Sequence, residues 1–244
     1  MSKPEFITLT GADDATSIDG MLALASQYPI EWGILFSPAR QGTGRYPSLA
    51  FMKKVTNAGL LLAAHVCGDY SRLLIDSGNL PDLEPLLSTG RFRRVQINTA
   101  NPASPQRVME WARTLGIRPI LQSRMEKDFP ASRSVHWLFD RSGGRGIQAQ
   151  VWPIEHDPER IVGFAGGISP RNAAERVAIL ESHAERYWID MESGIRDALD
   201  RFDLEACRMV CEAVYGEPPV SCTSTLPLPL PSRPTPVTHE ELSL

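Results

Sequence analysis

The sequence predicts an α/β protein of the (β/α)8 barrel class, and three observations support this prediction. Eight short runs of apolar and β-branched residues recur along the 244 residues, helical patterns lie between most of them, and glycine-bearing turns follow the last three. Strands that alternate with helices at this pace form a parallel sheet, and eight such repeats close it into a barrel. One barrel commonly fills a chain of this length, so we expect a single domain over residues 1–216.

Each predicted element has a local signal. The strands begin at Phe6, Glu31, Leu60, Arg93, Arg118, Val135, Ile161 and Arg186, and helices are expected over residues 17–28, 48–58, 105–115, 170–182 and 203–215. Pro105 and Pro170 stand where the first turn of a helix tolerates a missing N–H, and Ser169 can cap the second of these helices. The segment between the fifth and sixth strands is too short for a crossover helix, so we expect the fifth helix to be reduced to a turn or loop.

The composition excludes several classes of partner. The net charge is −4 and the basic residues are dispersed, which argues against nucleic acid and anionic membranes as partners. The chain has no apolar stretch of about 18 residues and no signal-peptide layout at its start, so we expect a cytoplasmic protein. After Gly216 the sequence becomes rich in proline, serine and threonine, and we expect residues 217–244 to be a disordered or extended, solvated tail.

The cysteines give no sign of metal binding or of a disulfide framework. The chain has four, at positions 67, 207, 211 and 222, without a CxxC pair. We interpret them as reduced thiols. Cys207 and Cys211 lie four residues apart on a predicted helix, and buried packing accounts for them.

The strongest functional signal is a pair of glycine turns after the seventh and eighth strands. Gly166 and Gly167 follow the seventh strand, and Ser193 and Gly194 follow the eighth. In barrels of this class the carboxyl ends of the strands carry the active residues, and the last two turns are the usual phosphate position. Glycine exposes backbone N–H groups, and helix N-termini favour anions. We therefore predict a phosphate site here; the alternative is that the glycines only permit tight turns.

Other chemically capable residues fall at the ends of the earlier strands. They are Thr8 and Thr10 after the first strand, residues 37–45 after the second, His65 and Cys67 after the third, Gln96 and Asn98 on the fourth, Gln122 and Arg124 after the fifth, Asp140 after the sixth and Asp190 after the eighth.

The order and spacing of these segments resemble the phosphoribosylanthranilate isomerase family of tryptophan biosynthesis, over most of residues 6–215. The segments that carry the resemblance are residues 6–11, 33–48, 95–97, 139–146, 165–173 and 189–194. Residues 165–173 are similar to the family's Ala-Gly-Gly segment of the seventh strand, and residues 189–194 to its eighth-strand aspartate and Ser-Gly pair. A shrunken fifth helix also occurs in that family.

The resemblance implies a TIM barrel that catalyses an Amadori rearrangement of a phosphoribosylated arylamine, without a metal or redox cofactor, as a monomer or homodimer. By position, it implies that Asp140 is the general acid and that Thr10 stands where the family has its basic cysteine. It implies that Arg45 engages the anthranilate carboxylate, a role that suits a guanidinium fork. Gln96 and Asp190 would also bind substrate, and Gly144, Gly166, Gly167, Ser193 and Gly194 would hold the phosphate.

Thr10 is the departure with the largest consequence. A threonine hydroxyl has a far higher pKa than a thiol and cannot act as a base without a partner. Asp13 or Asp14 after the first strand, or His65 and Cys67 after the third, are candidate replacements. Further departures are Asn98 in place of a histidine, an insertion over residues 39–44, and Glu192 beside Ser193; we expect Glu192 to point away from a bound phosphate. Arg145 and Arg171 are candidates for additional positive charge near the site.

Three hypotheses for function follow from the sequence. The first is an isomerase of the family type acting on a small phosphorylated sugar, with Asp140 as acid. The second is a noncatalytic barrel that binds phosphosugars and has lost the base. The third is an enzyme acting on another phosphorylated substrate, with His65 or Asp14 recruited.

Overall fold

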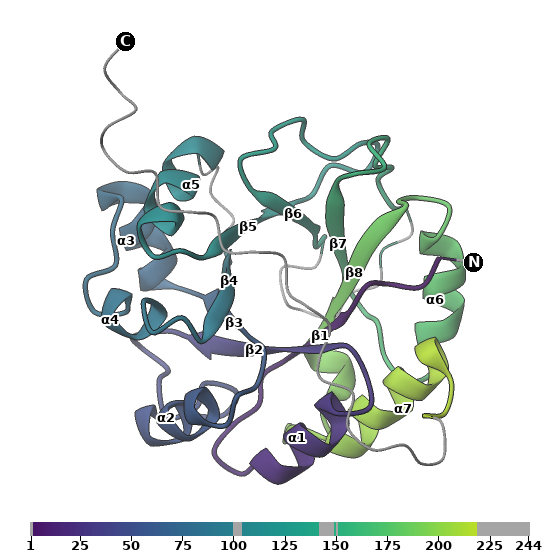
Figure 1. Ribbon diagram of the computed structural model, residues 1–244, viewed down its shortest axis with the longest axis horizontal. Helices are drawn as coiled ribbons and strands as arrows, with labels where there is room; N and C mark the ends of the chain where they lie inside the picture. The colour runs from purple at the N-terminus through teal and green to yellow at the C-terminus, as the bar shows by residue number, and fades with distance from the viewer. Residues whose placement is uncertain (1, 100–103, 142–148, 150, 219–244) are drawn as a thin grey trace.

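The computed structural model describes residues 2–99, 104–141, 149 and 151–218, and these form a closed barrel of eight parallel strands (Figure 1). Each strand pairs with the next in the chain, and the first pairs with the last through Ile7 and Ile189. All eight strands confirm the sequence prediction. They are β1 (Ile7–Thr10), β2 (Ile30–Phe36), β3 (Leu62–Val66), β4 (Phe92–Ile97), β5 (Arg118–Ser123), β6 (His136–Phe139), β7 (Ile161–Ala165) and β8 (Arg186–Met191).

Helices surround most of the barrel, as Figure 1 shows. They are α1 (Ile18–Ala25), α2 (Leu49–Asn57), α3 (Asp69–Ser77), α4 (Glu84–Leu87), α5 (Pro105–Thr114), α6 (Ala173–Leu180), the short 3₁₀ helix η1 (Ser193–Ile195) and α7 (Leu204–Tyr215). Residues 124–135, between β5 and β6, contain no helix, so the reduced fifth helix is confirmed.

Side-chain caps fix several helix starts. Ser17, Ser48 and Ser104 each accept a hydrogen bond from a first-turn amide of α1, α2 and α5, and Asp203 does the same for α7. The helix expected from Pro170 begins only at Ala173, because residues 170–172 form a turn. Ser169 does not cap it through its side chain. Instead the Ser169 amide donates to Asn172 Oδ1, at 2.9 Å.

Helices α3 and α4 were not predicted from the sequence. Helix α3 buries only Ser71 and Leu74, and its N-cap, Gly68, offers no side-chain hydrogen bond. Helix α4 is a single turn that buries Leu87. Neither helix therefore has the long apolar stripe or the capping residue by which helices are recognised in sequence.

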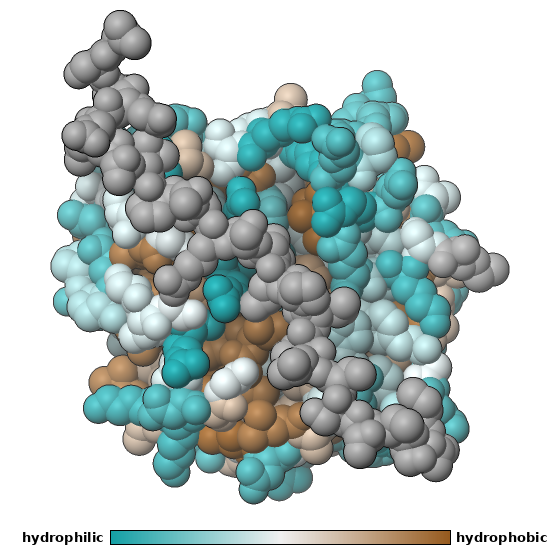
Figure 2. Space-filling model, in the orientation of Figure 1, coloured by the Kyte–Doolittle hydropathy of each residue, from teal (hydrophilic) through white to brown (hydrophobic). Residues whose placement is uncertain are grey.

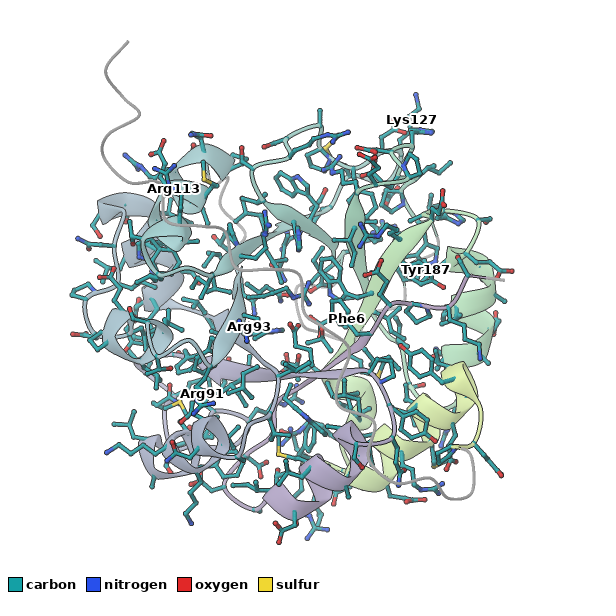
Figure 3. All side chains as sticks on the ribbon, viewed as in Figure 1. Phe6, Arg91, Arg93, Arg113, Lys127 and Tyr187 are labelled. Carbon is teal, nitrogen blue, oxygen red and sulfur yellow. The ribbon has the colours of Figure 1, made fainter. Side chains whose placement is uncertain are left out.

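A buried ion pair lies within the strands, below the carboxyl ends. Arg94 on β4 bonds Glu31 on β2, with Nε 2.9 Å from Oε2 and Nη2 2.5 Å from Oε1, and Thr8 donates to the same carboxylate. The Arg94 guanidinium lies 4.6 Å from the ring centroid of Phe6 and 4.2 Å from that of Trp188, with Phe6 near the centre of the view in Figure 3. Arg94 thereby fills the barrel interior, and Thr8, expected among the site residues, belongs to this cluster.

The rest of the core lies between the strands and the helices. Buried side chains of α1 and α2, such as Met21, Phe51 and Met52, belong to one cluster with Trp32 of β2. Figure 2 shows hydrophobic residues between α1 and α2, below β2, while hydrophilic residues cover much of the rim. Within the described part of the chain, no helix is long and apolar enough to span a membrane. The predicted tail, beyond its first two residues, lies outside the described residues.

Candidate active site

A cavity of about 590 Å³ opens at the carboxyl ends of the strands, and all eight strand ends contribute to its wall. A parallel barrel brings these ends to one face, so residues far apart in sequence meet there. The predicted site residues that line the cavity are Thr10, Arg45, Gln96, Asp140, Gly166, Gly167, Asp190, Ser193 and Gly194. Gly144 and Arg145 lie outside the described residues, and Arg171 is exposed and does not line the cavity.

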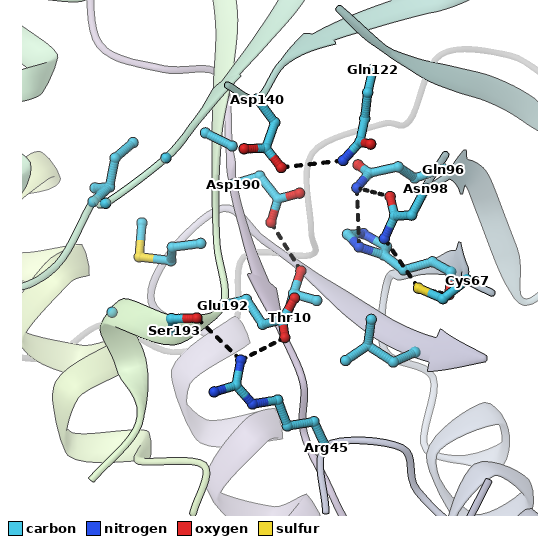
Figure 4. A pocket seen from close by; sticks show the side chains of 18 of the residues that line it. Thr10, Arg45, Cys67, Gln96, Asn98, Gln122, Asp140, Asp190, Glu192 and Ser193 are labelled. Carbon is cyan, nitrogen blue, oxygen red and sulfur yellow. Dashed lines mark hydrogen bonds and ion pairs between the residues drawn. The ribbon is translucent and has the colours of Figure 1, made fainter. Parts of the chain in front are cut away.

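Two buried carboxyl groups form part of the cavity wall, and Thr10 bonds one of them (Figure 4). Thr10 Oγ lies 2.9 Å from Asp190 Oδ1 and donates to it. Burial raises the pKa of Asp190 to about 8, and the negative charges of Asp140 and Glu192 add to this effect, while the hydrogen bond from Thr10 opposes it. Asp190 therefore carries a proton at neutral pH and loses it just above, which is the range in which one group can serve as acid or base.

Asp140 is the second carboxyl, at the end of β6. Its side chain is 5% exposed, and Gln122 on β5 donates to its Oδ2 from 3.2 Å. Asp140 and Asp190 are thus two titratable groups in different surroundings, an arrangement that can divide acid and base roles.

Four polar side chains at the carboxyl ends of β3 and β4 form a hydrogen-bonded row in the cavity wall, drawn in Figure 4. Gln96 Nε2 lies 2.8 Å from Asn98 Oδ1 and 3.4 Å from His65 Nδ1, and Asn98 Nδ2 lies 3.2 Å from Cys67 Sγ. The Gln96 amide hydrogen assigns His65 Nδ1 as an acceptor, which leaves the imidazole proton on Nε2. His65 Nε2 and Gln96 Oε1 are both buried and bond no described residue.

His65 and Cys67 are poor replacements for the missing base. Burial and the positive charge of Arg94 lower the pKa of His65 to about 3, so the imidazole is neutral and its Nε2 carries a hydrogen rather than a lone pair. Burial raises the pKa of Cys67 to about 11, so the nucleophilic thiolate is scarce at neutral pH. Of the two, only His65 offers an immediate function, as a hydrogen-bond donor to a ligand oxygen.

Asp13 and Asp14 hold loops together instead of facing the cavity. Asp13 accepts hydrogen bonds from the Ala15 amide and pairs with Arg196 at 3.2 Å. Asp14 accepts from the backbone amide and the hydroxyl of Ser48, at the start of α2. Neither lines the cavity, so the structure gives no support to either as the base.

Arg45 reaches the cavity from the loop after β2, but its guanidinium is already bound by two carboxylates (Figure 4). Nη1 lies 2.7 Å from Glu192 Oε1 and 3.1 Å from Ser193 Oγ. Nη2 and Nε lie 2.7 and 3.3 Å from the two oxygens of Asp200. Glu192 lines the cavity, where the Arg45 cation compensates its charge, and its orientation relative to a bound phosphate stays a prediction.

Arg40 lines the cavity too, as one of the residues 37–45 expected there, whereas Asp200 and Tyr46, which also line it, were not predicted from the sequence as site residues. Asp200 lies in a segment between β8 and α7 without a recognisable motif, and its left-handed φ of 60° is uncommon for a residue other than glycine. Arg40 stacks 5.7 Å from the ring centroid of Tyr46.

The glycine turns after β7 and β8 contact each other at the cavity. A Cβ on Gly194 would lie 1.9 Å from the carbonyl oxygen of Ile168, so only glycine allows this close approach. Gly166 and Gly167 have φ of 110° and 68°, the region that favours glycine. The Gly167 carbonyl accepts from Asn172 Nδ2 at 2.9 Å, which fixes the turn. The two turns therefore meet as the phosphate hypothesis requires. In the described part of the chain, no group of three or more metal-ligating side chains could hold a metal ion.

Solved structures resemble this fold, whereas no protein family model and no curated protein matches the sequence. A phosphoribosyl anthranilate isomerase from Thermus thermophilus is similar at a TM-score of 0.56 and 17% identity, over 85% of this chain and 96% of the other. A phosphoribosyl anthranilate isomerase in complex with reduced 1-(o-carboxyphenylamino)-1-deoxyribulose 5-phosphate gives 0.53 and 15%, over 89% and 100%. The α-subunit of tryptophan synthase from Pyrococcus furiosus gives 0.51 and 16%, over 88% and 98%. At such identities the likeness establishes the barrel fold alone.

Proposed function

We propose that this protein is an isomerase of the phosphoribosylanthranilate isomerase type, which converts a phosphoribosylated amine to an aminoketose by an Amadori rearrangement. The observation that carries the proposal is the pair of buried carboxyl groups, Asp140 and Asp190, in one cavity with the two glycine turns. The likeness in fold to phosphoribosyl anthranilate isomerases supports it, as does the order of the sequence segments that resemble that family.

In the reactive form of this proposal Asp140 is protonated and Asp190 is ionised. Asp140 is the general acid, which gives its proton to the ribose ring oxygen and opens the ring. The proton at the sugar C2 then passes to the Asp190 carboxylate, which Thr10 positions by the 2.9 Å hydrogen bond. Asp190 thus supplies the partner that a threonine in place of cysteine needs. A base with a pKa of about 8 is strong once ionised, so kcat/KM should rise with pH toward 8.

The remaining roles concern binding. The two turns formed by Gly166, Gly167, Ser193 and Gly194 would receive the phosphate through backbone N–H groups. Gln96 Oε1, buried and bonded to no described residue, would accept a hydrogen bond from a sugar hydroxyl. Gly144 remains a predicted phosphate contact.

A tryptophan auxotroph that lacks this isomerase provides the test, with the natural chain, Thr10→Cys and Asp140→Asn expressed side by side. We expect growth with the natural chain and none with Asp140→Asn, because the acid step is lost. Growth only after Thr10→Cys would favour a noncatalytic phosphosugar-binding barrel. If no variant grows while a ribose phosphate still raises the melting temperature, the substrate is a different phosphorylated compound.

A further inference from the structure

We infer that the cavity prefers a substrate whose amine substituent carries no carboxylate, because Glu192 and Asp200 occupy the Arg45 guanidinium that would otherwise recognise one. The preferred substituent is an uncharged or cationic amine, and a carboxylated arylamine is bound more weakly but is still converted, as growth of the tryptophan auxotroph requires. This inference rests on the proposed function and narrows its substrate class.

The guanidinium of Arg45 has no pair of parallel N–H groups left for a ligand carboxylate. Asp200 spans Nε and Nη2 with its two oxygens, and Glu192 takes Nη1 at 2.7 Å. Ser193 Oγ accepts a further hydrogen bond from Nη1, at 3.1 Å. A ligand carboxylate needs two parallel N–H groups for bidentate recognition, and here the pair formed by Nε and Nη2 is taken.

Asp200, which binds Arg45, is itself held by the buried side chain of Arg196. The side chain of Arg196 is only 2% exposed, and its Nε lies 3.0 Å from Asp200 Oδ1 and 2.9 Å from the Asp200 carbonyl oxygen. Arg196 Nη1 donates to the Gly11 carbonyl at 2.8 Å, and Nη2 pairs with Asp13. Asp200 is therefore held in place by the end of β1 and by its own loop, so a ligand carboxylate would not easily displace it.

The charge of the cavity wall leads to the same conclusion. Among the described residues the wall contains the cations Arg40, Arg45 and Arg124 and the acids Asp140, Asp190, Glu192 and Asp200. A phosphate dianion already adds two negative charges to this wall. A carboxylate near Arg45 would add a third, next to Glu192, where like charges repel. Arg40 and Arg124, the other cations of the wall, are exposed.

Two stable ligands distinguish the possibilities, measured by isothermal titration calorimetry on the full chain. One is reduced 1-(o-carboxyphenylamino)-1-deoxyribulose 5-phosphate, and the other is the same compound without the carboxyl group. The variants are Glu192→Gln and Asp200→Asn, each of which frees part of the guanidinium. Glu205→Gln is the matched control, because it removes one exposed carboxylate on α7 away from the cavity.

We expect the natural chain to bind the ligand without the carboxyl group about 10-fold more tightly, since one like-charge contact is avoided. In Glu192→Gln or Asp200→Asn the carboxylated ligand should bind as tightly as the ligand without the carboxyl group, or more tightly. Glu205→Gln should leave the ratio of the two dissociation constants unchanged. The inference would be overturned if the natural chain bound the carboxylated ligand more tightly, or if neither cavity variant changed the ratio of the two dissociation constants. Either result would leave the proposed function intact. Failure of both ligands to bind would remove the proposed function and this inference with it.

Discussion

Replacement of Asp190 by asparagine should abolish a pH dependence of stability that the natural protein shows between pH 5 and 7. In the folded protein the pKa of Asp190 is about 8, against an ordinary 3.8 in the unfolded chain. Below about pH 4 both states bind the proton. Between the two pKa values only the folded state does, so the free energy of unfolding falls as pH rises.

The magnitude follows from one proton. A difference of one bound proton changes the free energy of unfolding by about 1.4 kcal/mol per pH unit. Incomplete titration at both ends of the range reduces this change slightly. Between pH 5 and 7 the free energy of unfolding of the natural chain should therefore fall by about 2.5 kcal/mol relative to that of Asp190→Asn. The asparagine preserves an acceptor for the Thr10 hydroxyl, 2.9 Å away, so the comparison isolates the charge.

The assay is urea denaturation of both proteins at pH 5, 6 and 7, with the free energies compared as differences so that other titrating groups cancel. Asp197→Asn, at a partly buried loop carboxylate whose pKa is lowered by hydrogen bonds from Arg201, provides a control. A difference that stays within about 0.5 kcal/mol across this range, or that grows in favour of the natural chain, would refute a protonated Asp190 and the base proposed from it.

Two further predictions concern the barrel interior and the glycine turns. Glu31→Gln should lower the free energy of unfolding by about 3–5 kcal/mol, because it leaves the buried Arg94 charge without its partner. Arg94→Met in the same chain should restore part of this loss. Denaturation of the single and double variants measures it, and additive losses of unfolding free energy in the double variant would contradict the prediction. Gly194→Ala should cost about 1–3 kcal/mol and reduce the rise in melting temperature given by inorganic phosphate, because its Cβ would force the β8 turn away from the Ile168 carbonyl; an unchanged phosphate response would argue against the phosphate site.

Much of the barrel could be predicted from the sequence because its signals are local. Apolar runs such as the one at Ile161 are buried by any parallel sheet, and Ser17 or Ser104 caps a helix from its immediate neighbours. The positions of Asp140 and Gly166 at strand ends also followed, since a closed parallel barrel brings every strand end to one face. Helices with few buried residues, such as α3, gave no such signal.

The sequence by itself determined the strand order, the closed sheet and the face on which polar residues gather, because these depend on periodicity and on chain connectivity. Only the tertiary structure decided which charges meet there. Asp190 joins Thr10 across 180 positions, and Arg45 joins Glu192 across 147. Such pairings, and the pKa values that burial imposes on them, depend on distances of a few ångströms between side chains, which no local pattern in the chain encodes.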